Sequence, residues 1–247
     1  MTVTPQKIIY PDSDGQPMAD NTLQFRWIVL IKENLECLFA GDANVFVAGD
    51  LLWYPVEGHP EIRVAPDVMV VFGRPKGERG SYRQWEEDNI APQVVFEILS
   101  PGNRLMEMVK KLRFYEEYGV EEYYIYDPEQ NKLDVFLRRD RQLQEIGETN
   151  GWESPRLGIR FELNPDELAL YYPNGERFKT TVELANELQT ERQRAMQAMQ
   201  RAEAERQRAI QEAQRAEAER QRAEQERQRA ERLAEYLRSQ GVNPEQI

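Results

Sequence analysis

Apolar residues in the first 180 positions follow two different spacings, one typical of helices and one typical of strands. A spacing of three and four residues predicts a helix that is capped by Asp20 or Asn21, runs to about Phe39 and ends before Gly41. A second helix is expected over residues 104–118. Its inner face consists of Leu105, Met108, Leu112 and Tyr115.

Runs rich in β-branched and aromatic residues predict strands around these helices. The run 93–99 is almost wholly apolar except for Glu97, which is typical of a strand buried on both faces. The other expected strands are 44–48, 50–54, 62–72 with a break near Pro66, 123–126, a hairpin of 132–137 with 143–147, and one or two edge strands within 152–172. Residues 73–89 are polar and are expected to form a long loop.

The order of these elements indicates the fold class. A strand, a helix and a strand over residues 93–126 resemble a βαβ unit, whereas the strands before them look antiparallel. We therefore expect an α/β fold in which a mixed central sheet is flanked by helices.

From Thr181 to Gln240 the pattern changes to a seven-residue repeat without Gly or Pro. Ala or Leu recurs at every seventh position from Leu188 to Leu237, while the companion position three residues later is mostly Glu, which makes a weak coiled-coil seam. Glu and Arg three or four residues apart support a helix of roughly 90 Å. A solvated single helix, a weak Ala-seamed oligomer and partial disorder all remain open. The predicted domains are therefore 1–180, a charged helix over 181–240 and a flexible tail over 241–247.

The charge is concentrated in the first domain. Of the net charge of −12, residues 1–180 carry −11 (20 Lys and Arg against 31 Asp and Glu), and the remainder carries −1 (12 against 13). An acidic domain lacks the basic surface that draws proteins to phosphate backbones. It is compatible with carboxylates that become useful once a cation lies among them.

Composition also bears on the compartment. A single cysteine, Cys37, excludes an intramolecular disulfide and fits a reducing environment. The first ten residues lack the apolar core of a signal peptide, and no apolar run approaches the roughly 18–20 residues that span a bilayer. We expect a cytoplasmic protein with no membrane partner.

Three charged residues stand out as candidates for chemistry. Asp67 follows Pro66 inside an apolar run, Glu97 interrupts the most apolar strand, and Lys111 shares a helix face with Met108. Two carboxylates from different strands can hold one divalent cation, Mg²⁺ or Mn²⁺, through oxygen ligands. The cation would polarise a phosphoryl group, while the lysine would stabilise developing charge.

Each of these residues also has a structural interpretation. Asp67 after a proline can be a turn or bulge residue, and Glu97 can pair with Arg104 or Arg113. Lys111 can lie at a boundary and extend its ammonium group into water.

Two other features were weighed for function. His59 lies in a Gly-His-Pro turn, where a surface position is expected rather than a ligand. Tyr82, Arg83 and Trp85 in the long loop can stack on bases or form a packed lid. No phosphate-binding loop is present, because the glycines of this loop lack the P-loop spacing and lysine.

Four segments in combination resemble the Uma2 family of endonucleases, which have the restriction-endonuclease-like fold. The segments are Val64-Ala-Pro-Asp-Val-Met-Val-Val71, Pro92-Gln-Val-Val-Phe-Glu-Ile-Leu-Ser-Pro101, Lys111-Leu-x-x-Tyr115 and Gly119-Val-Glu-Glu-Tyr-Tyr-Ile-Tyr-Asp-Pro128. The resemblance covers about residues 20–175 and implies a PD-(D/E)xK-type site. It does not extend to the C-terminal helix.

The resemblance implies a role for each candidate. Asp67 would be the acid of the PD element and Glu97 the second acid, both binding Mg²⁺ or Mn²⁺. Leu99 stands where the usual E-x-K lysine would be, and Lys111 on the following helix aligns with the amine of Uma2-like proteins.

Two further residues match family positions in a supporting role. Glu107 fills the place of an acid four residues before the lysine, and Gln24 lies near the position of a first-helix histidine in many relatives. Glutamine cannot act as a general base.

Two functions follow from these observations. The first is a metal-dependent endonuclease that hydrolyses phosphodiester bonds of DNA. The alternative is a non-catalytic, nuclease-like docking module whose helical rod mediates protein interaction; the missing E-x-K lysine and the acidic surface motivate it. A homo-oligomer could form through the nuclease domain or the C-terminal helix.

Overall fold

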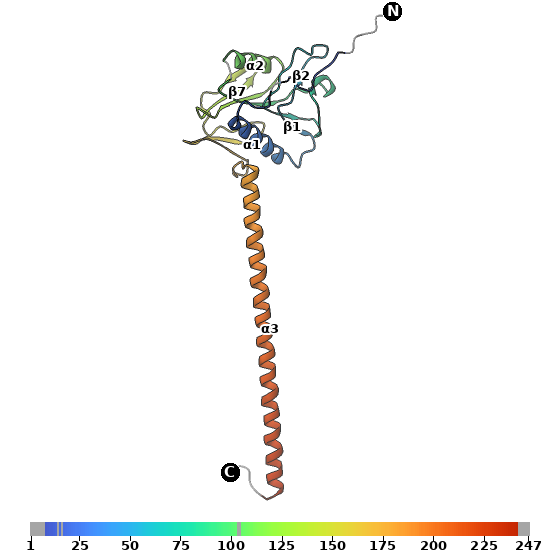
Figure 1. Ribbon diagram of the computed structural model, residues 1–247, viewed down its shortest axis with the longest axis vertical. Helices are drawn as coiled ribbons and strands as arrows, with labels where there is room; N and C mark the ends of the chain where they lie inside the picture. Colours follow the sequence, from blue (N-terminus) through green and yellow to red (C-terminus); the bar gives the residue numbers. More distant parts are fainter. Residues whose placement is uncertain (1–7, 14, 16, 103–104, 242–247) are drawn as a thin grey trace, which may run out of the picture. The chain divides into compact units, whose positions relative to one another are not determined.

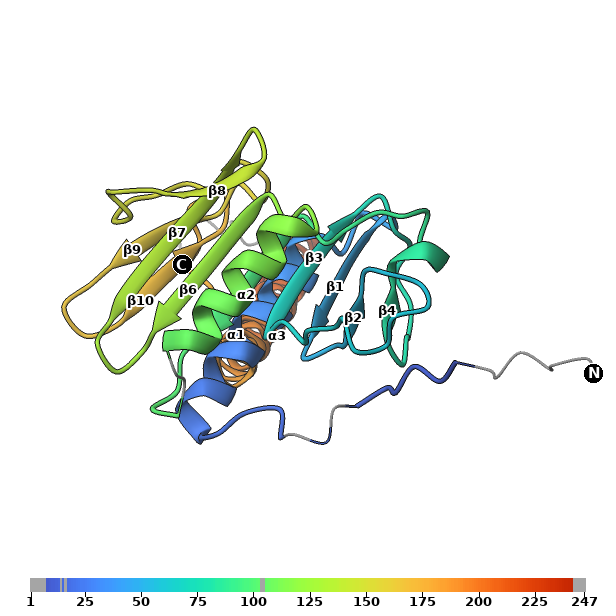
Figure 2. The same ribbon diagram turned by 90° about the horizontal axis from the view of Figure 1, so that it is seen from above.

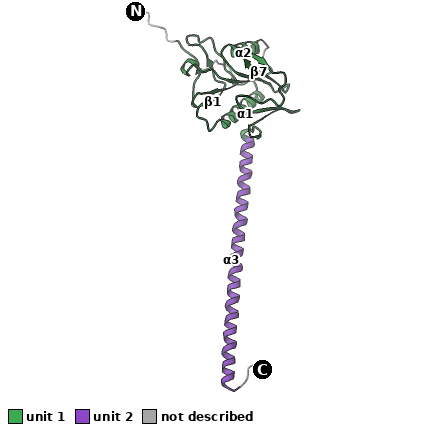
Figure 3. Cartoon of the chain, turned by 180° about the vertical axis from the view of Figure 1, so that it is seen from behind, with its two compact units in different colours: residues 1–181 green, residues 182–247 purple. Residues whose placement is uncertain are grey.

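The structure is a computed structural model that describes residues 8–13, 15, 17–102 and 105–241. The chain divides into two compact units, Met1–Thr181 and Val182–Ile247 (Figure 3). The predicted flexible tail lies outside the described residues from position 242 onward.

A mixed sheet forms the centre of the first unit. Within the described residues it has six strands in the order β1-β3-β5-β6-β7-β8. These are β1 (Val45–Gly49), β3 (Val68–Phe72), β5 (Val94–Ile98), β6 (Glu122–Asp127), β7 (Lys132–Arg139) and β8 (Gln142–Glu145). Only β5 and β6 pair in parallel, and α2 (Leu105–Glu117) joins them; every other neighbouring pair is antiparallel. The predicted α/β fold with a mixed sheet is confirmed.

The two faces of this sheet are covered by different elements (Figure 2). Helix α1 (Thr22–Leu38) packs on one face and α2 on the other. Strand β5 contributes to both cores, with Val94 and Phe96 facing α1 and Val95 facing α2. Burial on both faces explains why the sequence of β5 is nearly continuous in apolar residues.

Helix α1 begins as its sequence predicts. Asn21 is the N-cap, and its side-chain oxygen accepts a hydrogen bond from the backbone N–H of Gln24 at 2.8 Å. Trp27, Ile31 and Leu35 recur at four-residue intervals and are fully buried against the sheet.

Several strands differ from the prediction because their partners are distant in sequence. In the segment 50–54 only β2 (Trp53–Tyr54) is a strand, and it pairs in parallel with β4 (Tyr82–Arg83) from the predicted loop. That loop also contains the 3-10 helix η1 (Gln84–Glu86). The predicted strand over 62–72 begins only at Val68, after Pro66, which lacks a backbone N–H for pairing.

The predicted edge strands within residues 152–172 form a separate structure. β9 (Arg160–Leu163) and β10 (Leu168–Tyr171) pair with each other in an antiparallel two-stranded sheet. Phe161, Leu168 and Leu170 pack into the core on the α1 face, so this pair covers the central sheet instead of extending its edge.

The second unit contains a single continuous helix, α3 (Thr181–Ser239), of 59 residues (Figure 1). None of its residues is buried. Across the part of the chain that the structure describes, no helix has the length and apolar character needed to cross a membrane.

Candidate active site

The two candidate acids lie directly across from each other on neighbouring strands. In the antiparallel pairing of β3 with β5, Val68 is opposite Phe96, so Asp67, just before β3, comes opposite Glu97. Opposed residues of an antiparallel pair point to the same face of the sheet. Asp67 occupies a bend, as its turn interpretation suggested, but it is also buried and only 8% exposed.

Lys111 reaches the same place from α2. Its ammonium Nζ lies 2.7 Å from Oε2 of Glu97, and its side chain is only 18% exposed. The hydroxyl of Tyr115, one helical turn further along α2, donates to Oε1 of Glu97. Lys111 therefore does not extend its charge into water, and Glu97 is paired with Lys111 rather than with Arg113.

The remaining alternatives for these and other residues are resolved as follows. Arg104, the other suggested partner of Glu97, lies outside the described residues. His59 is exposed and contacts Glu61, as expected for a surface residue. Tyr82 is fully buried and donates to the carbonyl of Ile90, so it belongs to a packed loop and is not available to stack on bases.

Burial gives Asp67 an unusual proton affinity. Loss of solvent, and then the charge of Glu97, raise the pKa of Asp67 to about 8, although the charge of Lys111 and the N–H of Ile98 act in the opposite direction. That N–H donates to Oδ2 of Asp67 at 2.6 Å. Without a cation, the folded protein therefore favours a proton on Asp67 at neutral pH.

Lys111 is held in its charged form. Burial lowers its pKa, but the charges of Glu97 and Asp67 outweigh burial, so that the pKa of Lys111 is raised. Burial, and then Glu97, also raise the pKa of Tyr115 well above its ordinary value of 10.0. Both groups are hydrogen-bond donors to Glu97 at neutral pH.

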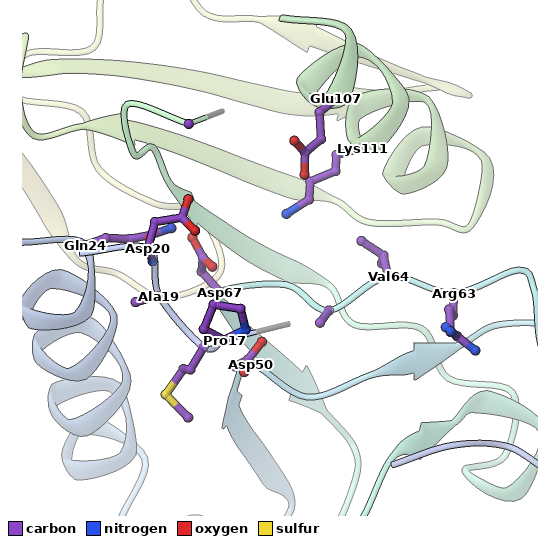
Figure 4. Close-up of a pocket in the computed structure, with 13 residues that line it drawn as sticks. Pro17, Ala19, Asp20, Gln24, Asp50, Arg63, Val64, Asp67, Glu107 and Lys111 are labelled. Atoms are coloured by element: carbon purple, nitrogen blue, oxygen red, sulfur yellow. The ribbon is translucent and has the colours of Figure 1, made fainter. Parts of the chain in front are cut away.

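A cavity of about 460 Å³ opens onto these residues (Figure 4). Asp67 and Lys111 border it from different elements, and Glu97 is not part of its lining, being only 3% exposed. Glu107, in the first turn of α2, is exposed and also borders the cavity. The other polar residues of the lining are Asp20, Gln24, Asp50 and Arg63.

Gln24 forms a bridge behind the cavity. Its Nε2 donates to the carbonyl of Ile98 at 2.8 Å, and its Oε1 accepts from the backbone N–H of Asp20 at 2.8 Å. The peptide unit of Ile98 is thus tied at its carbonyl by Gln24, while its N–H is bound to Asp67. Gln24 is a structural support in this arrangement and contacts neither Glu97 nor Lys111 through a hydrogen bond.

The donor set suits a small divalent cation. Within the described ranges, no three His, Cys, Asp or Glu side chains are grouped so as to hold a metal ion. Mg²⁺ needs fewer protein ligands, because it keeps several waters and commonly binds one or two carboxylates plus substrate phosphates. Asp67 and Glu97 supply two opposed carboxylates, and each hydrogen-bonded oxygen retains a further lone pair. The residues therefore fit Mg²⁺ or Mn²⁺.

The sequence interpretation missed two participants in this site. Tyr115 was assigned only to the inner face of its helix, although its position four residues after Lys111 places both on one side of α2. Asp50 has a left-handed backbone, with φ of 48°, and its N–H approaches the carbonyls of Pro66 and Asp67. No sequence pattern indicated that contact.

Comparisons with known proteins place this site in a family. No curated protein matches the chain. Among solved structures, the chain is similar to "a putative nuclease belonging to DUF820 from Anabaena variabilis ATCC 29413", at 14% identity and a TM-score of 0.39, over 58% of this chain and 78% of that one. The Uma2 family, described as "Putative restriction endonuclease", matches residues 15–170, which is more than half of the chain. The chain therefore belongs to the Uma2 family.

Proposed function

We propose that this protein is a divalent-cation-dependent endonuclease that hydrolyses phosphodiester bonds of DNA. The observation that carries the proposal is the meeting of Asp67, Glu97 and Lys111 at one end of an open cavity. Membership of the Uma2 family supports it. Two acids and an amine from three separate elements are the groups that this reaction requires.

Each residue has a distinct role in the proposed reaction. Asp67 and Glu97 would hold Mg²⁺ or Mn²⁺, which when bound polarises a phosphoryl group and activates water. Lys111 stays protonated because its pKa is raised, so it acts as a fixed positive charge that stabilises the phosphate in the transition state, not as a general base. Glu97 holds the ammonium group in position at 2.7 Å.

The charge of the cavity makes DNA binding depend on the cation. Acidic residues of the lining outnumber basic ones; they are Asp20, Asp50, Asp67 and Glu107, against Arg63 and Lys111. A phosphate backbone approaching this cavity meets net repulsion until a divalent cation offsets it. We therefore propose that metal and DNA bind cooperatively.

Plasmid nicking tests the proposal. The purified full-length protein should convert supercoiled plasmid to the open circular form with Mg²⁺ or Mn²⁺ and not with EDTA. Asp67→Ala and Glu97→Ala should each abolish nicking, and circular dichroism should confirm that they remain folded. Glu57→Ala, which removes an exposed carboxylate, is the matched control and should nick normally. Equal nicking by the wild type and both site variants would identify a contaminant and refute the assignment.

A second function is favoured by one feature of the site. Both oxygens of Glu97 already accept hydrogen bonds from Lys111 and Tyr115, a self-contained arrangement that a non-catalytic docking module would also need. Calorimetric titration with Mn²⁺ separates the two functions. An absence of binding, both alone and with DNA, would favour the docking module, whereas binding that Asp67→Ala removes would support the nuclease.

A further inference from the structure

One side of α3 carries three adjacent columns of residues, which we call the striped face. The central column consists of Leu188, Ala195, Ala202, Ala209, Ala216, Ala223, Ala230 and Leu237. The acidic column lies on one side of it and consists of Leu184, Glu191, Ala198, Glu205, Glu212, Glu219, Glu226 and Leu233. The basic column lies on the other side and consists of Ala185, Arg192, Met199, Arg206, Ala213, Arg220, Arg227 and Ala234.

The helix keeps these columns in register along its length. Positions three and four residues from a central residue flank it on opposite sides of an α-helix. Because α3 is continuous from Thr181 to Ser239, the seven-residue repeat is never interrupted. The striped face is exposed except for the half-buried Ala234 and Leu237 near its end.

We infer that the striped face binds the same face of a second copy of this chain, with the two helices parallel and in register. When two parallel helices face each other through their central columns, a twofold axis along the pair brings the acidic column of each against the basic column of the other. Small alanine side chains in the central column let the two backbones approach closely.

Charge complementarity holds level by level. The sequence Glu-Arg occurs across the two outer columns at 191–192, 205–206, 219–220 and 226–227. In the parallel pair, Glu205 of one copy therefore faces Arg206 of the second copy, and the reverse contact occurs on the other side. Levels without this pair match as well, since Ala198 faces Met199 and Leu233 faces Ala234 of the second copy.

The antiparallel arrangement is disfavoured by the same columns. Reversing one helix brings acidic column against acidic column and basic against basic. With the ends aligned, Glu191 would face Glu226, Glu205 would face Glu212, and Arg192 would face Arg227. Like charges directly opposite each other destabilise a helix pair, so orientation is set by charge although the alanines would permit either.

Pairs within one helix compete with this association. Arg227 lies 3.6 Å from Glu224 and 3.4 Å from Glu231 of its own helix. Exposed ion pairs of this kind contribute little each, and the alanine seam buries little area. The dimer is therefore expected to be reversible and dependent on protein concentration. A parallel pair tethers both N-terminal units at the same end, and its use in cutting both strands of a duplex rests on the proposed function.

Disulfide cross-linking of the full chain tests the orientation. In a Cys37→Ser background, Ala195→Cys and Ala230→Cys are made separately, with Gln200→Cys and Gln228→Cys, off the striped face, as controls. In a glutathione redox buffer, each alanine-site variant should form a covalent dimer of twice 29.0 kDa with itself, and the controls should not. Cross-linking only when the Ala195→Cys and Ala230→Cys chains are mixed would show an antiparallel pair. That result, or no cross-linking at all, would overturn the inference.

Charge reversal tests the columns independently. One chain carries Glu205→Arg, Glu219→Arg and Glu226→Arg. The other carries Arg206→Glu, Arg220→Glu and Arg227→Glu. Alone, each would place like charges along the dimer, and sedimentation should show a dissociation constant at least about tenfold weaker than wild type.

Mixing the two reversed chains should restore the dimer, because every facing pair is again opposite in charge. A defect within the helix itself, visible by circular dichroism, would not be repaired by mixing. Wild-type chain that remains monomeric, reversed chains that dimerise normally alone, or a mixture that stays monomeric would each contradict the inference. None of these measurements depends on nuclease activity, so failure of the proposed function leaves them interpretable.

Discussion

The buried carboxyl of Asp67 should make the folded protein less stable as pH rises. Its pKa is about 8 in the folded protein against an ordinary value of 3.8, so above about pH 4 the folded state holds a proton that the unfolded chain has released. A raised folded pKa contributes stability that is complete below the unfolded pKa and is lost as pH rises through the folded pKa. Between about pH 6 and about pH 9, this group alone should lower the free energy of unfolding by about 2–3 kcal/mol.

The variant Asp67→Asn isolates that contribution, because asparagine cannot ionise. Urea unfolding in EDTA, followed by tryptophan fluorescence at about pH 6 and about pH 9, gives the free energy of unfolding at each pH. We expect wild type to lose about 2–3 kcal/mol more than Asp67→Asn over this range, and the exposed control Glu57→Gln to behave like wild type. An equal loss in wild type and Asp67→Asn would show that Asp67 is not protonated in the folded protein, and would refute the electrostatic account of the site.

Three further predictions follow from contacts of the first unit and from the division between the units. Lys111→Met leaves Glu97 buried without its cation and should lower the free energy of unfolding by about 3 kcal/mol in EDTA, whereas the exposed neighbour Lys110→Met should change it little; equal effects would contradict the buried ion pair. Gln24→Leu removes the donor to a buried carbonyl at the end of β5 and should cost about 1–3 kcal/mol in the same assay, with no measurable loss counting against that support. Deletion of residues 184–247 should leave the melting temperature of the N-terminal unit unchanged and its melting cooperative, because the chain divides into separate units near Thr181; a non-cooperative melt would refute separate domains.

Local sequence determined the helices and the most buried strand. Asn21 caps α1 through its own side chain, and the interval from Trp27 to Leu35 fixes which side of the helix is buried. The absence of Gly and Pro allows α3 to run for 59 residues without a break. These features depend on neighbours within a turn or two of the chain, so the pattern of residues was sufficient to predict them.

The candidate acids and the lysine were also visible in the sequence, but their meeting was not. A charged residue inside an apolar run is noticeable anywhere, and the sequence spacing of Asp67, Glu97 and Lys111 does not specify a distance between them. Only the antiparallel register of β3 with β5 places the two acids opposite each other, and only the packing of α2 on that face brings the lysine to 2.7 Å from Glu97.

Tertiary structure alone decided the contacts between distant segments. The partner of β2 comes from a loop some 30 residues later in the chain, and β9 with β10 forms a sheet of its own because its apolar side chains cover the α1 face. The bond from Gln24 to Ile98 and the raised pKa of Asp67 likewise depend on which groups are buried together. Hydrogen-bond register and loss of solvent are properties of the assembled chain, and for that reason no local pattern of residues encodes them legibly.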